Sequence, residues 1–388
     1  MLYIGLMSGT SADGIDGALV DLTDNGFRIL ATHSVDYSPG IKDAIESVIR
    51  LYPDVSEQEI HQLDKALGED FARVAAELAR ETGSEQAIAA IGSHGQTVYH
   101  GPGDDPPRSL QLADPGLIAS RTGLIVVADF RSNDLRAGGQ GAPLAPAFHN
   151  AMFRNADANR LVVNIGGIAN LTSLPAHRDK PVLGFDTGPG NTLMDQWCRL
   201  HTGRAFDAGG QWAARGRVDE VLVEALLSDP YFAAAAPKST GREYFHLGWM
   251  KERYPGWREI PAADLQASLL EVTARSIARA ATDVGGDGAE VYICGGGARN
   301  EALMARLDAL VRGGVATTDA LGLPAEWVEA CAFAWLAHRR IHERPGNLPS
   351  VTGASREVLL GNIHLPDGAP PDAASHRDPR PGAPGHRV

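Results

Sequence analysis

The chain opens with residues 2–22, LYIGLMSGTSADGIDGALVDL, and this stretch sets the pattern of the fold. The apolar run at 2–7 predicts a strand, the small residues at 8–14 predict a loop, and the roughly alternating run at 15–22 predicts a second strand. A turn at Asp24-Asn25-Gly26 leads to a third strand over 27–35. Three consecutive strands therefore begin the protein.

Helices and strands alternate in the rest of the first half. Apolar periodicity predicts helices over 40–51 and 57–82, then a buried strand over 87–91 that ends in Gly92-Ser93-His94-Gly95-Gln96. A short helix near 114–122 and a strand over 124–128 complete this half.

The same order of elements then returns. Strands are predicted at 161–165, 168–174 and 182–185, helices at 191–202 and 264–284, a strand at 290–294, a helix at 300–311, a strand at 314–318 and a helix at 325–342. Three strands, helix, strand, helix, strand thus occurs twice, with insertions in the second copy. We expect a duplicated α/β domain that binds a ligand between its halves.

Domain limits follow from this pattern. We assign residues 1–132 to a first lobe and 133–365 to a second lobe with insertions. The tail at 366–388 is rich in Pro, Gly, Ala and Asp and has almost no apolar residues, so we expect it to be disordered.

Composition excludes several classes of function. The 388 residues carry a formal net charge of −13 and no basic tract, which argues against nucleic-acid or anionic-membrane binding. No apolar run approaches the roughly 20 residues of a membrane-spanning helix, and the N-terminus lacks a positively charged leader. The cysteines, Cys198, Cys294 and Cys331, show no metal or redox spacing. A cytoplasmic protein with buried free thiols is the expectation.

Four loops of small residues follow predicted strands, at 8–14, 164–167, 186–191 and 295–300. Glycine lets backbone N–H groups approach phosphate oxygens closely, although any single loop of this kind is as typical of a tight turn. Four such loops at corresponding places in two halves indicate a nucleotide held between lobes. No Walker motif occurs. A dinucleotide site at 295–300 stays a weaker alternative, because Asn300 replaces the third glycine while Asp319 lies at a suitable distance.

Three acidic residues are candidates for chemistry. Asp13 lies within the first loop, where a carboxylate suits a phosphate-bound divalent cation, and an Asx-turn is an equally good interpretation. Asp16 follows on the second strand. Asp186 ends an apolar strand and suits a general base, with a helix N-cap as the alternative.

Further polar residues lie where a ligand would be expected. His94 and Gln96 follow a buried strand, and Arg131 could pair with a substrate carboxylate or form a surface ion pair. Glu329 is a single acid on an apolar helix, so it needs either an ion-pair partner or a ligand.

Together these motifs resemble the anhydro-N-acetylmuramic acid kinase family. The resemblance rests on Gly5 to Asp16, Ser93 to His100, Ala128 to Arg131 with Gly138 to Leu144, Asn164 to Asn170, Gly184 to Asn191, Gly295 to Asn300, and Glu329 to Trp335. It spans the chain from residue 2 to about 365, and the first motif is the most specific.

The resemblance implies a duplicated actin-like ATPase fold, related to ribonuclease H, with two lobes around a nucleotide cleft. It implies ATP and Mg²⁺ as cofactors and a homodimer. The substrate would be 1,6-anhydro-N-acetylmuramic acid from peptidoglycan turnover, opened by water and phosphorylated on O6.

The expected site residues are assigned from the motifs and the resemblance. The catalytic base is Asp186, and Asp13 is the metal-ligand candidate. The nucleotide-binding residues are Gly9, Thr10, Ser11, Ala12, Asp13, Gly14, Ile15, Asp16, Asn164, Gly166, Gly167, Gly295, Gly296, Gly297 and Asn300. The substrate-binding residues are His94, Gln96, Thr97, Val98, Arg131 and Glu329.

Two other functions stay open at this point. One is the phosphorylation of a different sugar on the same fold. The other is an actin-like ATPase module that acts on no small substrate, which would hydrolyse ATP at a rate that sugars do not change.

Overall fold

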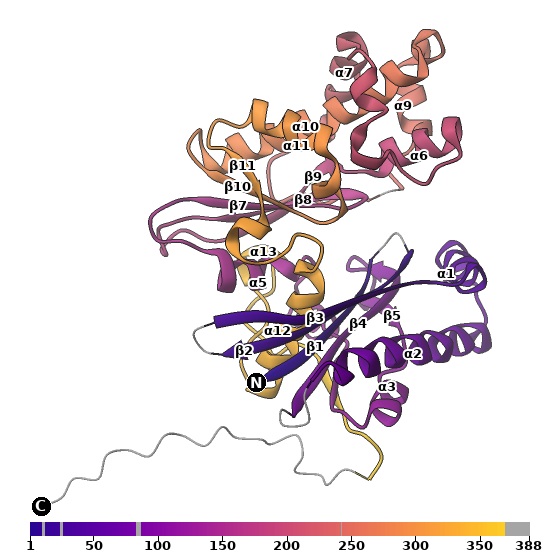
Figure 1. Cartoon of the computed structure of the whole chain (residues 1–388), viewed down its shortest axis with the longest axis vertical. Coiled ribbons are helices and arrows are strands. Elements are labelled where there is room, and N and C mark those ends of the chain that lie inside the picture. Colours follow the sequence, from indigo (N-terminus) through magenta and orange to yellow (C-terminus); the bar gives the residue numbers. More distant parts are fainter. Residues whose placement is uncertain (10–11, 24–25, 83–86, 242, 369–388) are drawn as a thin grey trace, which may run out of the picture.

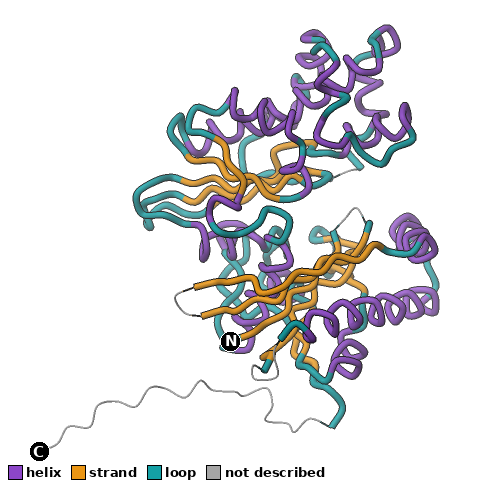
Figure 2. The backbone as a smooth tube through the Cα atoms, viewed as in Figure 1, coloured by secondary structure: helices purple, strands orange, loops and turns teal. Residues whose placement is uncertain are grey.

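The computed structural model describes residues 1–9, 12–23, 26–82, 87–241 and 243–368. Most of the predicted tail, from residue 369 onward, lies outside these residues. Two sheets, each with helices packed against it, form the two halves of the molecule (Figures 1 and 2). Within the described ranges, no helix has the length and apolar character needed to span a membrane.

The first sheet is mixed. Its strands lie in the order β12-β6-β4-β1-β2-β3, and β5 pairs with β4. β1 pairs antiparallel with β2 and parallel with β4, and β2 pairs antiparallel with β3. The strands are β1 (Leu2–Ser8), β2 (Gly14–Thr23), β3 (Gly26–Asp36), β4 (Ile88–Gly101), β5 (Arg108–Leu112), β6 (Val126–Ala128) and β12 (Asn362–His364).

The second sheet repeats the plan. Its order is β11-β10-β7-β8-β9, with β7 antiparallel to β8 and parallel to β10. The strands are β7 (Arg160–Ile165), β8 (Ile168–Leu174), β9 (Leu183–Pro189), β10 (Glu290–Cys294) and β11 (Val315–Thr317). When β5 and the returning β12 are left aside, both sheets thus follow the order third, second, first, fourth, last strand of their half. This confirms the duplicated, ribonuclease H-like α/β fold.

Side-chain alternation explains how the first sheet is covered on both faces. Ile4 and its neighbours on one face pack in a core with α2, whereas Tyr3 points into the opposite core with α12. Figure 1 shows α2 and α12 on opposite faces of this sheet. The helices of the first half are α1 (Pro39–Leu51), α2 (Glu57–Arg80), α3 (Pro115–Thr122) and α4 (Ser132–Arg136).

The second sheet carries α10 on one face and α5 on the other. Between β9 and α10 the chain inserts a group of short helices, which lie at the far end of this half (Figure 1). The helices of this half are α5 (Ala145–Phe153), α6 (Thr192–Thr202), α7 (Glu220–Leu227), α8 (Pro230–Ala233), α9 (Leu247–Arg253), α10 (Ala262–Gly285), α11 (Glu301–Leu310), α12 (Val328–Ile341) and α13 (Pro349–Thr352).

Two features of the first sheet differ from the sequence expectation. The strand predicted to end at residue 91 continues to Gly101, because β4 gains β5 as an antiparallel partner. His94, Gln96, Thr97 and Val98 therefore lie within a strand rather than in a loop after it. β12, which was not predicted, pairs with β6, so the C-terminal segment returns to the first sheet. The proposed division near residue 132 therefore separates the two sheets except for this returning segment.

Helix α12 lies unusually close to the first sheet. A Cβ atom added to Gly5 on β1 would lie 1.8 Å from the carbonyl oxygen of Ala330, and one added to Gly92 on β4 would lie 2.0 Å from that of Phe333. Both carbonyls belong to α12. Only glycine permits this approach, so these two positions fix the height of α12 above the sheet.

Gly5→Ala should therefore destabilise the protein. Displacing α12 or straining β1 costs about 1–3 kcal/mol for added core volume, and the rigid backbone contact places this variant at the upper end. Gly40→Ala is the matched control, because nothing lies within 4 Å of its added Cβ. Urea unfolding followed by circular dichroism measures both. Equal unfolding midpoints for the two variants would contradict the close packing of α12.

Candidate active site between the lobes

The loop between β1 and β2 is held from below by buried polar side chains. Ser8 Oγ lies 2.7 Å from the carbonyl oxygen of Gly14 and 2.7 Å from Gln96 Oε1. Gln96 Nε2 donates to the carbonyl oxygen of Gly9 at 3.2 Å. Ala12 adopts a φ of 52°, a left-handed conformation that costs energy for a residue with a side chain. The described parts of this loop, residues 9 and 12–13, are thus held in place, and the backbone is strained at Ala12.

The predicted residues of this loop differ in what they offer a ligand. Thr10 and Ser11 lie outside the described residues. The Ile15 side chain is fully buried in the core, so only its backbone is available. Asp13 is exposed and forms an ion pair with Lys42. Asp16 accepts a hydrogen bond from Ser34 Oγ at 2.7 Å, and burial raises the pKa of its carboxyl.

Two glycines of the second sheet present bare backbone to open space. An added Cβ would meet its nearest neighbour only at 3.7 Å for Gly166 and 4.0 Å for Gly296. Gly295 and Gly297, in contrast, pack against Asn164 and Ile165. The carbonyl oxygen of Gly167 accepts hydrogen bonds from the backbone N–H groups of Gly190 and Thr192, and it therefore fixes the start of α6. Backbone N–H groups at such open glycines fit the phosphates of a nucleotide.

Asn300 has a structural task. Its Oδ1 accepts the backbone N–H of Leu303 at 3.0 Å and so caps α11. Its contact with a nucleotide stays a prediction. Because Oδ1 is used by the cap, Nδ2 is the amide atom that is free to donate a hydrogen bond to a nucleotide.

Glu329 connects the two halves of the site. It lies in the first turn of α12 and hydrogen-bonds Asn164 at the end of β7. Burial, together with the nearby charge of Asp16, raises the pKa of Glu329. Asn164 Oδ1 is buried and has no hydrogen-bond partner among the described residues. An unpartnered acceptor beside two carboxyl groups is suited to a hydroxyl, an amine or a hydrated cation.

Arg131 is a buried cation on the first-lobe side. Its Nη1 donates to the carbonyl oxygen of Gly141 at 2.8 Å and its Nη2 to His94 Nε2 at 2.8 Å, while Nε has no partner within the described ranges. Burial lowers the pKa of Arg131 to about 10, so it stays charged at neutral pH. In the part of the chain that the structure describes, no carboxylate forms an ion pair with it. Such a guanidinium is poised for an anionic ligand.

His94 is fixed as a neutral acceptor. Burial and the charge of Arg131 lower its pKa to about 3. Because arginine only donates, His94 Nε2 accepts from Arg131, and Nδ1 carries the proton that goes to the carbonyl oxygen of Gly95 at 2.8 Å. His94 therefore orients Arg131.

The other predicted substrate residues on β4 have side chains that are already engaged within the protein. Gln96 is fully buried. Its Oε1 accepts from Ser8 Oγ, and its Nε2 donates to the carbonyl oxygens of Gly9 and Thr97. Thr97 Oγ1 accepts from Gln111 Nε2 at 3.2 Å, and Val98 is buried in the core. The structure therefore places Gln96 against the loop rather than toward open space.

Asp186 is surrounded by a segment that the sequence did not single out. Its Oδ2 accepts the backbone N–H of Thr240 at 2.9 Å, and its carbonyl oxygen accepts from Tyr231 Oη at 2.7 Å. The backbone N–H of Asp186 donates to the carbonyl oxygen of Lys238 at 2.9 Å. Burial, aided by the charge of Glu243, raises the pKa of Asp186 to about 6. Asn191, not Asp186, lies at the start of α6, so the N-cap alternative fails.

Charges also face one another across the lobes. Asp195 on α6 has a pKa raised to about 7, first by burial and then by the charges of Asp13 and Asp207. Arg299 forms an ion pair with Glu326 and is close enough to Asp16 to lower that residue's pKa. Within the described residues, no hydrogen bond or ion pair joins Asp186 to Arg131 or Glu329. These groups therefore act together only through a ligand or through movement of the lobes.

A metal ion would need help from a ligand. The described side chains contain no group of three His, Cys, Asp or Glu that could hold one. Asp16 lies close enough to Glu329 for its charge to raise the pKa of that residue, and Asp13 is engaged by Lys42. Mg²⁺ is commonly held by one or two carboxylates together with substrate phosphates, and these residues fit that arrangement.

The duplicated sheets, with open glycines and the half-buried Asp186 carboxyl on the second of them, define an actin-like ATPase fold of the sugar-kinase kind. The comparisons identify the family. The family described as anhydro-N-acetylmuramic acid kinase matches residues 1–366, so the chain belongs to that family.

Relatives of known name agree. The anhydro-N-acetylmuramic acid kinase of Coxiella burnetii (strain Dugway 5J108-111) is 47% identical over 93% of this chain and 97% of its own length. That of Xanthomonas oryzae pv. oryzae (strain MAFF 311018) is 48% identical over 94% and 97%. A crystal structure of xylulose kinase from Rhodospirillum rubrum is 14% identical over 97% of this chain and 95% of its own, with a TM-score of 0.40, too slight a likeness to inform function.

Gln96→Ala should loosen the β1–β2 loop. It removes one hydrogen-bond partner each from the Ser8 hydroxyl and the Gly9 carbonyl, which keep the Gly14 carbonyl and the Ala12 N–H. The loss of these bonds costs about 1–3 kcal/mol of stability and should weaken binding of a non-hydrolysable ATP analogue. Gln111→Ala on β5 is the control, since that amide bonds only the hydroxyls of Thr97 and Ser109. Calorimetry measures both variants. Unchanged nucleotide affinity in Gln96→Ala would argue against this support.

Proposed function

We propose that the protein is an ATP-dependent kinase that opens 1,6-anhydro-N-acetylmuramic acid with water and phosphorylates O6, giving N-acetylmuramic acid 6-phosphate. The observation that carries the proposal is the buried Asp186 carboxyl, whose raised pKa suits a general base, in a chain of this family. The reaction would serve the recycling of peptidoglycan amino sugars in the cytoplasm.

The nucleotide would bind between the lobes. Backbone N–H groups of the loop at 9–14 and of Gly166 and Gly167 would hold phosphates, and Gly295 to Gly297 would line the remainder of the nucleotide. Mg²⁺ would neutralise phosphate charge, held by carboxylates on the first-lobe side of the site. Phosphoryl transfer depends mainly on such positioning and charge stabilisation.

The sugar would bind beside Arg131, His94 and Glu329. The lactyl carboxylate of the substrate is the anion that the unpaired Arg131 guanidinium would bind, with His94 holding that guanidinium in place. Glu329 and the Asn164 amide would hydrogen-bond sugar hydroxyls or the acetamido group. Thr97 and Val98 would contribute their β4 backbone.

The chemistry then follows from the base. Asp186 takes a proton from a water molecule while the oxygen of that water attacks C1 of the sugar. The C1–O6 bond breaks, and O6 attacks the γ-phosphorus while the bond to ADP breaks. O6 gains charge as its bond to C1 is lost, so it needs no separate strong base. Thr240 and Tyr231 hold Asp186 in position throughout.

We further propose that the chain forms a homodimer, on the strength of the family resemblance. Light scattering of the purified protein gives its mass directly. Other sugars are tested by a substrate panel, because only an anhydrosugar takes up water into its product.

Asp186→Asn should abolish most turnover. The amide keeps the size and can still accept from Thr240, but it cannot take the proton, which is worth roughly 10²–10⁴-fold. The variant should unfold at no lower temperature than the parent, because it removes a carboxylate that burial destabilises. Product mass and a thermal melt measure both effects. Turnover in oxygen-18 water should label C1 in the parent; label in the phosphate, or near-normal turnover by the variant, would overturn the mechanism.

The rate should also depend on pH through Asp186. The base acts only when ionised, so kcat should fall as the pH drops through about 6 and level off above it. Glu243→Gln removes a negative charge that raises this pKa, so its inflection should lie at lower pH. Profiles of kcat for the two proteins test the assignment. Coincident inflections would show that another group controls the acid limb.

A further inference from the structure

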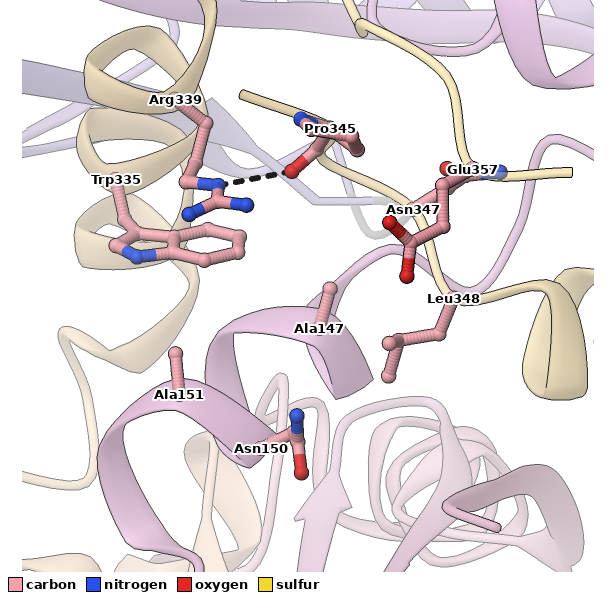
Figure 3. A pocket seen from close by; sticks show the side chains of 9 residues that line it. All are labelled: Ala147, Asn150, Ala151, Trp335, Arg339, Pro345, Asn347, Leu348 and Glu357. Atoms are coloured by element: carbon pink, nitrogen blue, oxygen red, sulfur yellow. Dashed lines mark hydrogen bonds between the residues drawn. The ribbon is translucent and has the colours of Figure 1, made fainter. Parts of the chain in front are cut away.

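A cavity of about 210 Å³ lies away from the interlobe site, where the chain passes between the lobes. Its walls come from α5, the first helix of the second half, from α12, and from the segment around residues 345–357 (Figure 3). α12 belongs to the core of the first sheet, whereas α5 contacts β8 of the second. The cavity is thus bounded by elements of both lobes.

Arg339 brings an unpaired positive charge to this cavity. Its Nε donates to the carbonyl oxygen of Pro345 at 2.8 Å, and its guanidinium lies 5.4 Å from the centroid of the Trp335 ring. No carboxylate in the described part of the chain forms an ion pair with it. Partial burial and the charge of Arg344 lower the pKa of Arg339, and the charge of Glu357 acts in the opposite direction.

Glu357 supplies the opposite charge from across the cavity. Figure 3 shows its carboxylate and the Arg339 guanidinium on opposite sides of the cavity, and no ion pair joins the two within the described residues. Glu357 is exposed, and no hydrogen bond or ion pair involves its side chain within the described residues. The cavity therefore holds a separated cation and anion, each with capacity for a ligand.

The rest of the wall is apolar and small. Ala147 and Ala151 of α5, with Leu348, line the side between the two charged groups (Figure 3). The volume lies below the roughly 300–1,000 Å³ of typical ligand sites, so a nucleotide or a sugar of the proposed reaction does not fit. A ligand of this site must be small, carry both a positive and a negative charge, and be partly aliphatic.

We propose that this cavity binds a free aliphatic α-amino acid. The α-carboxylate pairs with Arg339, the α-ammonium pairs with Glu357, and the side chain packs against Ala147, Ala151 and Leu348. A simple amine would leave the partly buried Arg339 guanidinium without a partner, and a simple carboxylate would make no contact with the exposed Glu357, so the zwitterion is selected. The site is independent of the sugar and nucleotide chemistry proposed above.

Three probes of nearly equal shape test this selection. L-leucine carries both charges, 4-methylpentanoate lacks the ammonium, and 3-methylbutylamine lacks the carboxylate. We expect saturable binding of leucine to the full-length protein by isothermal titration calorimetry or ligand-observed NMR, and at least about tenfold weaker binding of the other two. No saturable leucine binding, or equal binding of the single-charge analogues, would overturn the proposal.

Variants place the binding in this cavity. Glu357→Gln changes an exposed side chain and should fold normally, yet weaken leucine binding about tenfold or more. Arg339→Gln should do the same, although it also removes the bond to Pro345. Arg312→Gln is the control, because it removes a surface charge paired with Asp287 outside this cavity. Leucine affinity unchanged in Glu357→Gln, or lowered equally in Arg312→Gln, would refute the site.

Discussion

The close contact between α12 and the first sheet is the constraint on which the site depends. Gly5 and Gly92 allow two carbonyls of the helix to lie almost against β1 and β4. The first turn of α12 then brings Glu329 to Asn164 of the second lobe. A side chain at either glycine would raise the helix and move this carboxyl. The same helix carries Trp335 and Arg339 into the cavity at the crossing between lobes.

Around this frame the protein keeps several charges in unfavourable surroundings. Arg131 is buried without a carboxylate partner in the described structure, and Asp186 titrates near pH 6 because of burial. Ala12, and Asp129 with a φ of 58°, adopt left-handed backbone conformations close to the site. Such features cost stability and are found where a site must be ready for a charged ligand. Here they surround the region proposed to hold phosphates and the sugar carboxylate.

The two lobes are joined by buried hydrogen bonds at one place and carry like charges that face each other at another. Buried Asp134 accepts from Gly141 N, Asn347 Nδ2 and Thr352 Oγ1, which joins α4 to the returning C-terminal segment. Away from this connection, Asp13 of the first lobe lies close enough to Asp195 of the second for its negative charge to raise the pKa of Asp195. A bound cation or ligand between them would relieve this repulsion. The arrangement fits two lobes that are joined firmly at one side and approach each other when ligands bind.

The sequence by itself determined the duplicated order of strands and helices, because apolar periodicity and small-residue loops are local properties of the chain. It also identified the small-residue loops next to strands, and charged residues such as Asp186 and Glu329, because these stand out within apolar segments. Tertiary structure alone decided what those residues contact. Gln96 is predicted as a substrate residue but lies fully buried beneath the β1–β2 loop, because β4 continues past residue 91 once β5 pairs with it. The segment around Thr240 and Tyr231 reaches Asp186 from more than 40 residues away, through an insertion with no repeated pattern. Contacts between distant segments depend on how the sheets and insertions pack, and no local pattern encodes them.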